Sequence, residues 1–145
     1  MTLEIAEVAE ATAEVHEALT RLLPQLNPNL PLPTRERIQA LMDDPAVTLV
    51  IARDGDRIVG TATVIVYTTP YWIKARLDEV VVDKDARGKG VGEAIVRHCL
   101  EVGRRKGAQV AELQSGRGEV RVAAHRLYKR IGFVIRDSDI FRISL

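Results

Sequence analysis

Residues 87–92, with the sequence Arg-Gly-Lys-Gly-Val-Gly, combine three glycines with two cationic side chains. They lie between a run of three valines and an amphipathic pattern that predicts a helix over 91–106. The first amides of a helix have no partners within it, and the helix dipole adds positive charge there. Because glycines let the backbone approach a ligand closely, the stretch predicts an anion site suited to phosphate or pyrophosphate. A tight turn in which the glycines serve only geometry is the alternative.

Two well-known nucleotide motifs fit this stretch poorly. A P-loop requires the spacing G-x-x-x-x-G-K-[ST], which the chain does not contain. A dinucleotide fingerprint requires a third glycine after Gly88 and Gly90 at a fixed place, where this chain has none. Neither motif therefore identifies the phosphate ligand.

The remaining pattern predicts a mixed sheet with helices on its faces. Strands alternate with helices and with an antiparallel hairpin, which excludes an all-helical or all-strand fold. We expect the following elements: a short strand around Leu3 and Ile5, a helix within 9–26, a proline-rich loop over 24–34, a helix over 35–44 capped by Thr34, a hairpin over 47–67 with its turn at Asp54-Gly55, a linker over 68–75, strands over 76–83 and 108–114, a helix over 119–131 ended by Gly132, and two short strands within 133–144.

Composition places the chain among ordinary globular proteins. Its 145 residues are enough for a single domain, expected to span 1–145. The net charge of +1 gives no reason to expect a nucleic-acid or membrane partner. The only cysteine, Cys99, lies on the apolar side of its predicted helix, so we expect core packing and no internal disulfide. The acidic N-terminus predicts neither a signal peptide nor a membrane span, and a cytoplasmic protein is expected.

Two segments together resemble the GCN5-related N-acetyltransferase family. The segment 80–96 resembles the family's motif A, R/Q-x-x-G-x-G/A, in which Arg87, Gly90 and Gly92 take the specified positions. The segment 123–133 resembles its motif B, A-x-x-L-Y-x-x-x-G-F, and the matching residues are Ala124, Leu127, Tyr128, Gly132 and Phe133. The resemblance implies an α/β fold with a mixed, mostly antiparallel sheet of six to seven strands. It also implies a splay between the two middle strands and about four flanking helices.

The resemblance further implies acetyl coenzyme A as cosubstrate. No metal is expected, because His16 and His98 have no neighbouring ligands at metal spacing. Its pyrophosphate would lie on the backbone of Arg87, Gly88, Lys89, Gly90, Val91 and Gly92. The pantetheine arm would run along the strand that contains Val80, Val81 and Val82, as an added strand does, and an amide of this strand would polarise the acetyl carbonyl. His125 stands where many relatives have an asparagine that contacts the arm. It would keep that contact, act as a proton acceptor or be an exposed helix residue.

The reaction that the resemblance implies is direct attack of a primary amine on the thioester. Tyr128 matches the family's tyrosine that protonates the departing sulfur; stabilisation of the thiolate by a hydrogen bond and a purely structural role are alternatives. Glu79 and Asp78 occupy positions where relatives carry an acid that deprotonates the amine. Strand alternation would point them to opposite faces, and we expect Glu79 to serve. Pairing of Glu79 with Arg76 or Lys74 is the alternative.

Several features leave more than one interpretation open. A catalytically silent coenzyme A-binding module is the main alternative function, and a protein that binds another nucleotide is the third. The acceptor amine is not identified, and a homodimer is possible. Arg117 and Arg121 would bind the cofactor's 3′-phosphate or an acidic acceptor, or remain solvated. The aromatic residues Tyr67, Tyr71 and Trp72 would line the acceptor entrance or form the end of a hairpin.

Overall fold

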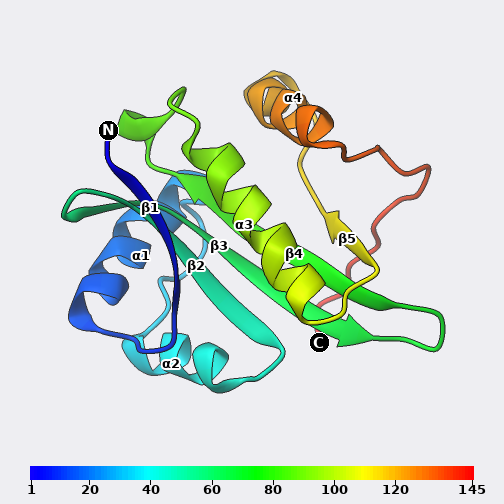
Figure 1. The fold of residues 1–145 in the computed structure, drawn as a ribbon, viewed down its shortest axis with the longest axis horizontal. Coiled ribbons are helices and arrows are strands. Elements are labelled where there is room, and N and C mark those ends of the chain that lie inside the picture. Colours follow the sequence, from blue (N-terminus) through cyan, green and yellow to red (C-terminus); the bar gives the residue numbers. More distant parts are fainter. The chain divides into compact units, whose positions relative to one another are not determined.

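The computed structural model describes all 145 residues, which form two compact units, Met1–Gln114 and Ser115–Leu145. Each unit is described by itself. The first contains β1 (Leu3–Val8), α1 (Ala13–Leu26), α2 (Arg35–Asp43), β2 (Val47–Asp54), β3 (Arg57–Thr68), β4 (Ile73–Val82), the 3₁₀ turn η1 (Lys84–Ala86), α3 (Val91–Arg105) and β5 (Val110–Leu113). The second contains the 3₁₀ turn η2 (Glu119–Arg121) and α4 (Val122–Ile131) (Figure 1). No helix is both long and apolar enough to cross a bilayer.

The sheet of the first unit has five strands in the order β1-β2-β3-β4-β5. All neighbours are antiparallel except β4 and β5, which are parallel, so the predicted mixed and mostly antiparallel sheet is confirmed. The pairing of β4 with β5 runs from Lys74↔Val110 to Leu77↔Leu113 and then stops. Beyond Leu77, β4 continues for five residues without a strand on that side. The predicted splay therefore lies between β4 and the edge strand β5, and not between two middle strands.

The two strands predicted within 133–144 are absent, so the sheet has five strands rather than six or seven. Apolar side chains in this segment are exposed, with Val134 at 82% and Phe141 at 93% of their full accessibility. The apolar residues of this segment suggest strands, but a strand also needs a hydrogen-bonded neighbour, and this segment has none. The prediction was therefore wrong on the number of strands.

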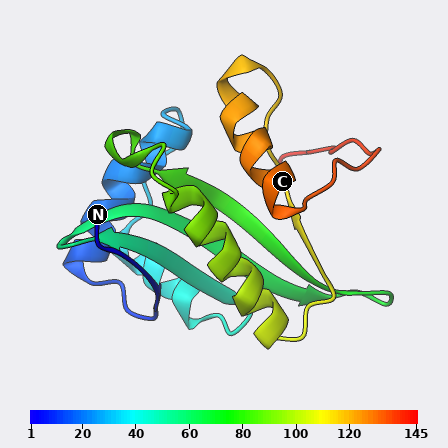
Figure 2. The same ribbon diagram turned by 45° about the horizontal axis from the view of Figure 1, so that its top comes forward.

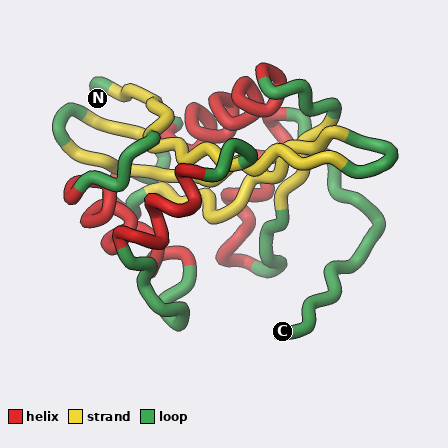
Figure 3. Tube along the Cα trace, turned by 90° about the horizontal axis from the view of Figure 1, so that it is seen from below, coloured by secondary structure: helices red, strands yellow, loops and turns green.

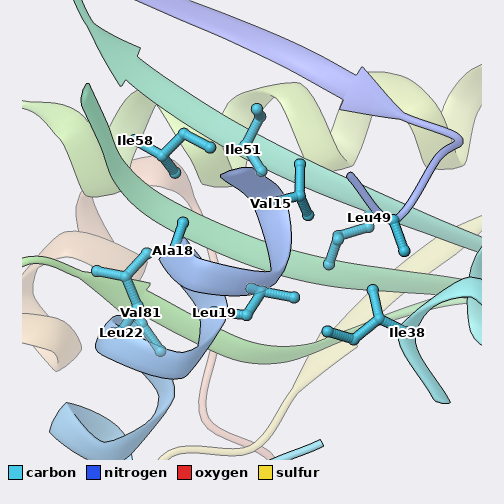
Figure 4. Close-up of a cluster of buried hydrophobic side chains, with 10 residues drawn as sticks. Val15, Ala18, Leu19, Leu22, Ile38, Leu49, Ile51, Ile58 and Val81 are labelled. Carbon is cyan, nitrogen blue, oxygen red and sulfur yellow. The ribbon is translucent and has the colours of Figure 1, made fainter. Parts of the chain in front are cut away.

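Helices cover both faces of the sheet. In the first unit α3 lies along one face, and α1 and α2 lie on the other (Figures 2 and 3). The core on the side of α1 and α2 is drawn in Figure 4, and its buried residues are Ala11, Val15, Ala18, Leu19, Leu22, Ile38, Leu49, Ile51, Ile58 and Val81. On the other face α3 lies very close to the sheet. A Cβ at Gly60 would come within 2.6 Å of the Ile95 side chain, and one at Gly103 within 2.9 Å of Ala75.

Most predicted elements are present, but several boundaries differ; the predicted helix over 119–131, for example, is the 3₁₀ turn η2 followed by α4. Thr34 caps α2 as predicted, because its hydroxyl accepts from the Arg37 N–H at 3.0 Å. The predicted loop over 24–34 begins later, since α1 continues through Pro24 to Leu26 and places Leu26 against the core. The hairpin turn lies at 55–56, one residue beyond the predicted one, because Asp54 pairs with Arg57. The predicted linker over 68–75 shrinks to 69–72, because β3 and β4 pair as far as Thr68↔Ile73.

Candidate active site

The glycine turn, residues 87–92, connects η1 to the start of α3. Gly88 and Gly90 have φ angles of +77° and +82°, which other residues adopt only with strain. A Cβ at either position would meet no atom within 4 Å. Backbone conformation, and not crowding by the protein, therefore demands glycine here. The same open space lets another molecule come close to the backbone.

The amides of the glycine turn have no partners in the chain. None of the N–H groups of residues 87–92 donates a hydrogen bond, whereas the Gly90 carbonyl accepts the first bond of α3, from Ala94 at 3.1 Å. Gly90 is also the N-cap and offers no side chain to satisfy these donors. Unpartnered N–H groups at the positive end of a 15-residue helix form an anion-binding surface.

The two cations of the turn fold back onto the segment that precedes it. The Nε atom of Arg87 donates to the Val82 carbonyl at 3.1 Å, and the Nζ atom of Lys89 donates to the Asp85 carbonyl at 3.5 Å. Both side chains are exposed. Their charges therefore lie beside the free amides, where they add to the attraction for an anion.

The strand that feeds the turn contains a β-bulge. The pairing of β3 with β4 shifts from Thr63↔Asp78 to Thr61↔Val81, so that Glu79 and Val80 both lie opposite Ala62. Glu79 has φ +46° and is the only residue other than glycine with a positive φ. For an L-residue such a conformation costs about 1–2 kcal/mol. An insertion of this kind locally bends and twists the strand, at the place where β4 has lost β5.

After the bulge, the side chains of β4 point to the opposite face of the sheet from the one that the alternation before it would give. Ala75 lies against Gly103 of α3, whereas Val81 belongs to the core on the side of α1. Positions 75 and 81 are an even number of residues apart, so an unbroken strand would place both on the same face. The alternation that led us to expect Asp78 and Glu79 on opposite faces is thus interrupted at Glu79.

Glu79 has no hydrogen-bond or ion-pair partner. Arg76 instead binds Asp78 at 3.1 Å and the Gln114 side chain at 3.1 Å, and Lys74 binds Glu112 at 2.8 Å. The alternative in which Glu79 pairs with Arg76 or Lys74 is therefore wrong. Glu79 is exposed at the surface, and neighbouring protein atoms desolvate its carboxyl only in part. This desolvation raises the pKa of the carboxyl, the charge of Asp78 acts in the same direction, and the charge of Arg76 opposes both. A free carboxylate with a raised pKa is suited to accept a proton.

In the second unit, Tyr128 belongs to the C-terminal cap of α4. Gly132, at φ +120°, donates to the Lys129 carbonyl, and Phe133 donates to the Tyr128 carbonyl at 3.0 Å. The Tyr128 and Phe133 rings meet edge to face with centroids 6.0 Å apart. This is the Schellman motif with its hydrophobic contact, and it gives the Tyr-x-x-x-Gly-Phe spacing a structural reason as well. Desolvation raises the pKa of the Tyr128 phenol, against the opposing charge of Arg121.

His125 is half-buried and holds the loop before α4. Its Nε2 atom lies 2.9 Å from the Gly116 carbonyl, within the second unit. One ring nitrogen is thereby occupied. The helix itself contains no fully buried residue.

Other residues singled out in the sequence have structural positions. Burial raises the pKa of the Cys99 thiol to about 12, so its packing role in the core is confirmed. The residues Tyr67, Tyr71 and Trp72 lie at the exposed end of the β3–β4 hairpin. No group of three or more His, Cys, Asp and Glu side chains could hold a metal ion.

Sequence reasoning missed two features of this site. One is the bulge at Glu79, which depends on the pairing partner. The other is the burial of Asp83, which reads as part of a solvated turn in the sequence Asp-Lys-Asp-Ala. The only signal for Asp83 was its position before a short turn, where an aspartate caps backbone N–H groups.

The model of the acetyltransferase (GNAT) family matches residues 12–133. That match covers most of the chain and extends across both units. The protein belongs to this family, as the two motifs indicated.

Known relatives agree with this assignment. An uncharacterized N-acetyltransferase of Methanocaldococcus jannaschii is 36% identical over 59 residues, which are 41% of this chain and 25% of that protein. The match thus spans a quarter of the curated relative's length. An aminoglycoside acetyltransferase from an uncultured soil metagenomic sample, solved in complex with sisomicin, has a TM-score of 0.85 at 21% identity, covering 99% of this chain and 96% of its own.

A third likeness is to AAC(6')-Iy, solved in complex with the bisubstrate analog CoA-S-monomethyl-acetylneamine. Its TM-score is 0.82 at 15% identity, with 100% of this chain and 99% of that chain covered. At such identities the solved structures establish the fold alone, and they confirm the predicted fold class.

Proposed function

We propose that this protein is an acetyl-CoA-dependent N-acetyltransferase that acetylates a primary amine. The observation that carries the proposal is the row of unpartnered amides at 87–92, placed at the end of a strand whose outer edge is itself unpaired. A diphosphate on the turn and an extended arm along 78–82 would use these two sets of backbone groups in sequence, apart from the Val82 carbonyl, which Arg87 binds. Val91 would contribute its N–H to the diphosphate, although its side chain is buried.

The open edge of β4 supports the placement of the pantetheine arm. Val80 and Val82 are half-buried and Val81 is buried, so the strand offers an apolar wall on which few polar groups compete. An amide of this strand would donate to the acetyl carbonyl oxygen and stabilise the negative charge that develops during attack. His125 would add a contact to the arm through the ring nitrogen that Gly116 does not use.

The proposed reaction is a direct transfer. The amine nitrogen forms a bond to the acetyl carbon, the carbon–sulfur bond breaks with its electron pair going to sulfur, and the ammonium proton leaves to a base. Glu79 is the proposed base, since it is unpaired and its pKa is raised. A lysine-type amine with pKa near ~10.4 costs about 4.6 kcal/mol to deprotonate at pH 7, whereas an α-amine costs about 1 kcal/mol. The base therefore matters most for acceptors of the lysine type.

Tyr128 is proposed to stabilise the departing thiolate. Its raised pKa makes complete proton transfer to sulfur more unfavourable than it would be for an ordinary phenol. A hydrogen bond from the phenol to the thiolate needs no such transfer. We therefore favour donation of a hydrogen bond, with the proton following from solvent.

The wider setting is also part of the proposal. Residues 1–145 would act as one acetyltransferase domain in the cytoplasm, with no nucleic-acid or membrane partner, and a homodimer is compatible with the fold. The acceptor would be a small molecule or a peptide that carries a free amine. An amine-rich aminoglycoside belongs to that class, as the ligand of the metagenomic enzyme illustrates.

The test begins with binding of coenzyme A by calorimetry and continues with thiol release from acetyl-CoA over a panel of amines, each product identified by mass spectrometry. We expect binding and amine-dependent thiol release. Binding without turnover on any amine would favour the silent coenzyme A-binding module. Absence of binding would refute both functions.

A further inference from the structure

A buried carboxylate, that of Asp83, follows the last residue of β4 and caps η1, which leads into the glycine turn. The side chain of Asp83 is 3% exposed, and Asp83 and Thr61 are the only buried polar or charged residues in the chain. Burial alone would raise the pKa of Asp83, but the Asp85 N–H, the Arg57 and Gln25 side chains and the charge of Arg21 outweigh it and lower that pKa. Asp83 is therefore held as an anion inside the protein.

Helix α1 supplies the closer of two ion-pair partners of this anion; the other, Arg57 of β3, binds the same carboxylate oxygen at 3.3 Å. The Nη1 atom of Arg21 donates to Asp83 Oδ2 at 2.7 Å, and its Nη2 atom donates to the Ile58 carbonyl at 2.8 Å. One turn further along α1, the side chain of Gln25 accepts from the Lys84 N–H at 2.9 Å. Two side chains of a single helix thus hold the end of β4, the start of β3 and the first residue of η1.

Asp83 also forms hydrogen bonds with the backbone of the residues that follow it. Its other oxygen, Oδ1, accepts from the Asp85 N–H at 3.2 Å, and its carbonyl accepts from the Ala86 N–H at 2.8 Å. The next residues are 87–92, whose own amides bond to nothing in the chain. The position of these amides therefore depends on how the two ends of the turn are held. Asp83 and η1 hold one end, and the buried Val91 holds the other.

We propose that Arg21, acting through Asp83, is a positioning residue that sets where the amides of 87–92 lie at the end of β4. If the proposed function holds, the Arg21–Asp83 pair affects the affinity for coenzyme A without contacting coenzyme A. This consequence rests on the proposed function. Neither residue belongs to the amide row or to the 78–82 edge. The pair thus makes helix α1, on the opposite face of the sheet from α3, part of the cofactor site.

A second ion pair on α1 provides a matched control. Glu14 binds Arg53 of β2 through two contacts of 2.7 and 2.6 Å, so it also joins α1 to the sheet with an arginine and a carboxylate. No hydrogen bond leads from that pair to the glycine turn. The variants Arg21→Gln and Asp83→Asn are therefore compared with Arg53→Gln. A further variant, Arg21→Lys, keeps the positive charge but lacks the guanidinium group that binds both Asp83 and the Ile58 carbonyl.

The experiment measures coenzyme A affinity by calorimetry, together with the KM for acetyl-CoA and kcat for an accepted amine. Loss of the pair should weaken coenzyme A binding and raise the KM by about tenfold, with kcat changed less than about twofold, because transfer itself is not altered. Arg21→Lys should give an intermediate loss, and Arg53→Gln should bind like the wild type. Unchanged affinity in Arg21→Gln, or an equal loss in Arg53→Gln, would overturn the inference.

A readout without ligand separates this inference from the proposed function. The amide resonances of Gly88 and Gly90 in a ¹⁵N–¹H spectrum should shift in Arg21→Gln and Arg21→Lys and stay in place in Arg53→Gln. If the wild type fails to bind coenzyme A, the proposed function is lost, yet these shifts still decide whether Arg21 positions the turn. Resonances that do not move in either Arg21 variant would refute the positioning role.

Discussion

Substitution of Gly90 by alanine tests the glycine turn against a control on the same helix. Gly90 precedes α3 with φ +82°, and Gly107 follows it with φ +87°. A Cβ at either position would meet no atom within 4 Å. The two substitutions therefore impose the same strain on the backbone and create no clash. They differ in one respect, which is that Gly90 lies among the unpartnered amides.

The expected loss of stability is small and equal. An alanine at a positive φ costs about 1–2 kcal/mol, and the smaller entropy of the unfolded chain returns about 0.4–1 kcal/mol of this. Each variant should thus lose about 1 kcal/mol of unfolding free energy, which for a chain of this size lowers Tm by about 2–4 °C. Both proteins remain folded at 25 °C.

The expected effect on binding is unequal. A methyl group at Gly90 projects into the open space from which a diphosphate would approach, so coenzyme A affinity should fall by at least about tenfold, or 1.4 kcal/mol. Gly107→Ala should bind like the wild type. Thermal unfolding and calorimetry on the three proteins provide both measurements. Equal affinities for the two variants, at equal losses of Tm, would refute the assignment of the turn as the diphosphate site.

Three further predictions concern individual side chains. Tyr128→Phe should lower kcat about tenfold or more and leave the affinity for coenzyme A nearly unchanged; an unaltered kcat would remove the phenol from the mechanism. Glu79→Gln should lower activity most below the pH optimum, with recovery at higher pH where the amine loses its proton unaided; a uniform loss across pH would indicate a structural role. Asp83→Asn should cost about 2–3 kcal/mol of unfolding free energy at pH 7. Because the folded pKa of Asp83 is lowered, that cost should shrink as pH falls below about 3.9 and through the folded pKa, in urea denaturation series at several pH values; a cost independent of pH would contradict the ionised pair.

Local sequence signals were sufficient for the elements that frame the site. The apolar period of α3, the capping threonine of α2 and the glycines that end α3 and α4 each depend on neighbours a few residues away. The glycine turn could be predicted for the same reason, since free amides at a helix start follow from helix geometry alone. Tyr128 came from its motif, and its capping contacts were not predicted.

Features that depend on distant partners could not be predicted. The bulge at Glu79 arises from the register between β3 and β4, and no local pattern distinguishes it from a regular strand. Asp83 is buried, and its closest ion-pair partner, Arg21, is 62 residues away in sequence. The segment 133–144 shows the converse error: its apolar residues predict two short strands, but none forms because the segment has no hydrogen-bonded neighbour.

The extra residue in β4 constrains the length of that strand more than its composition. Deletion of Val80 would match the two strands residue for residue, and each position from Val81 onward would turn to the other side. A valine now enclosed beside α1 would then be presented to α3, and the carboxylate of Asp83 would leave the guanidinium of Arg21. Substitutions in this strand can therefore be tolerated, whereas the deletion of one residue would disrupt both the core and the diphosphate turn.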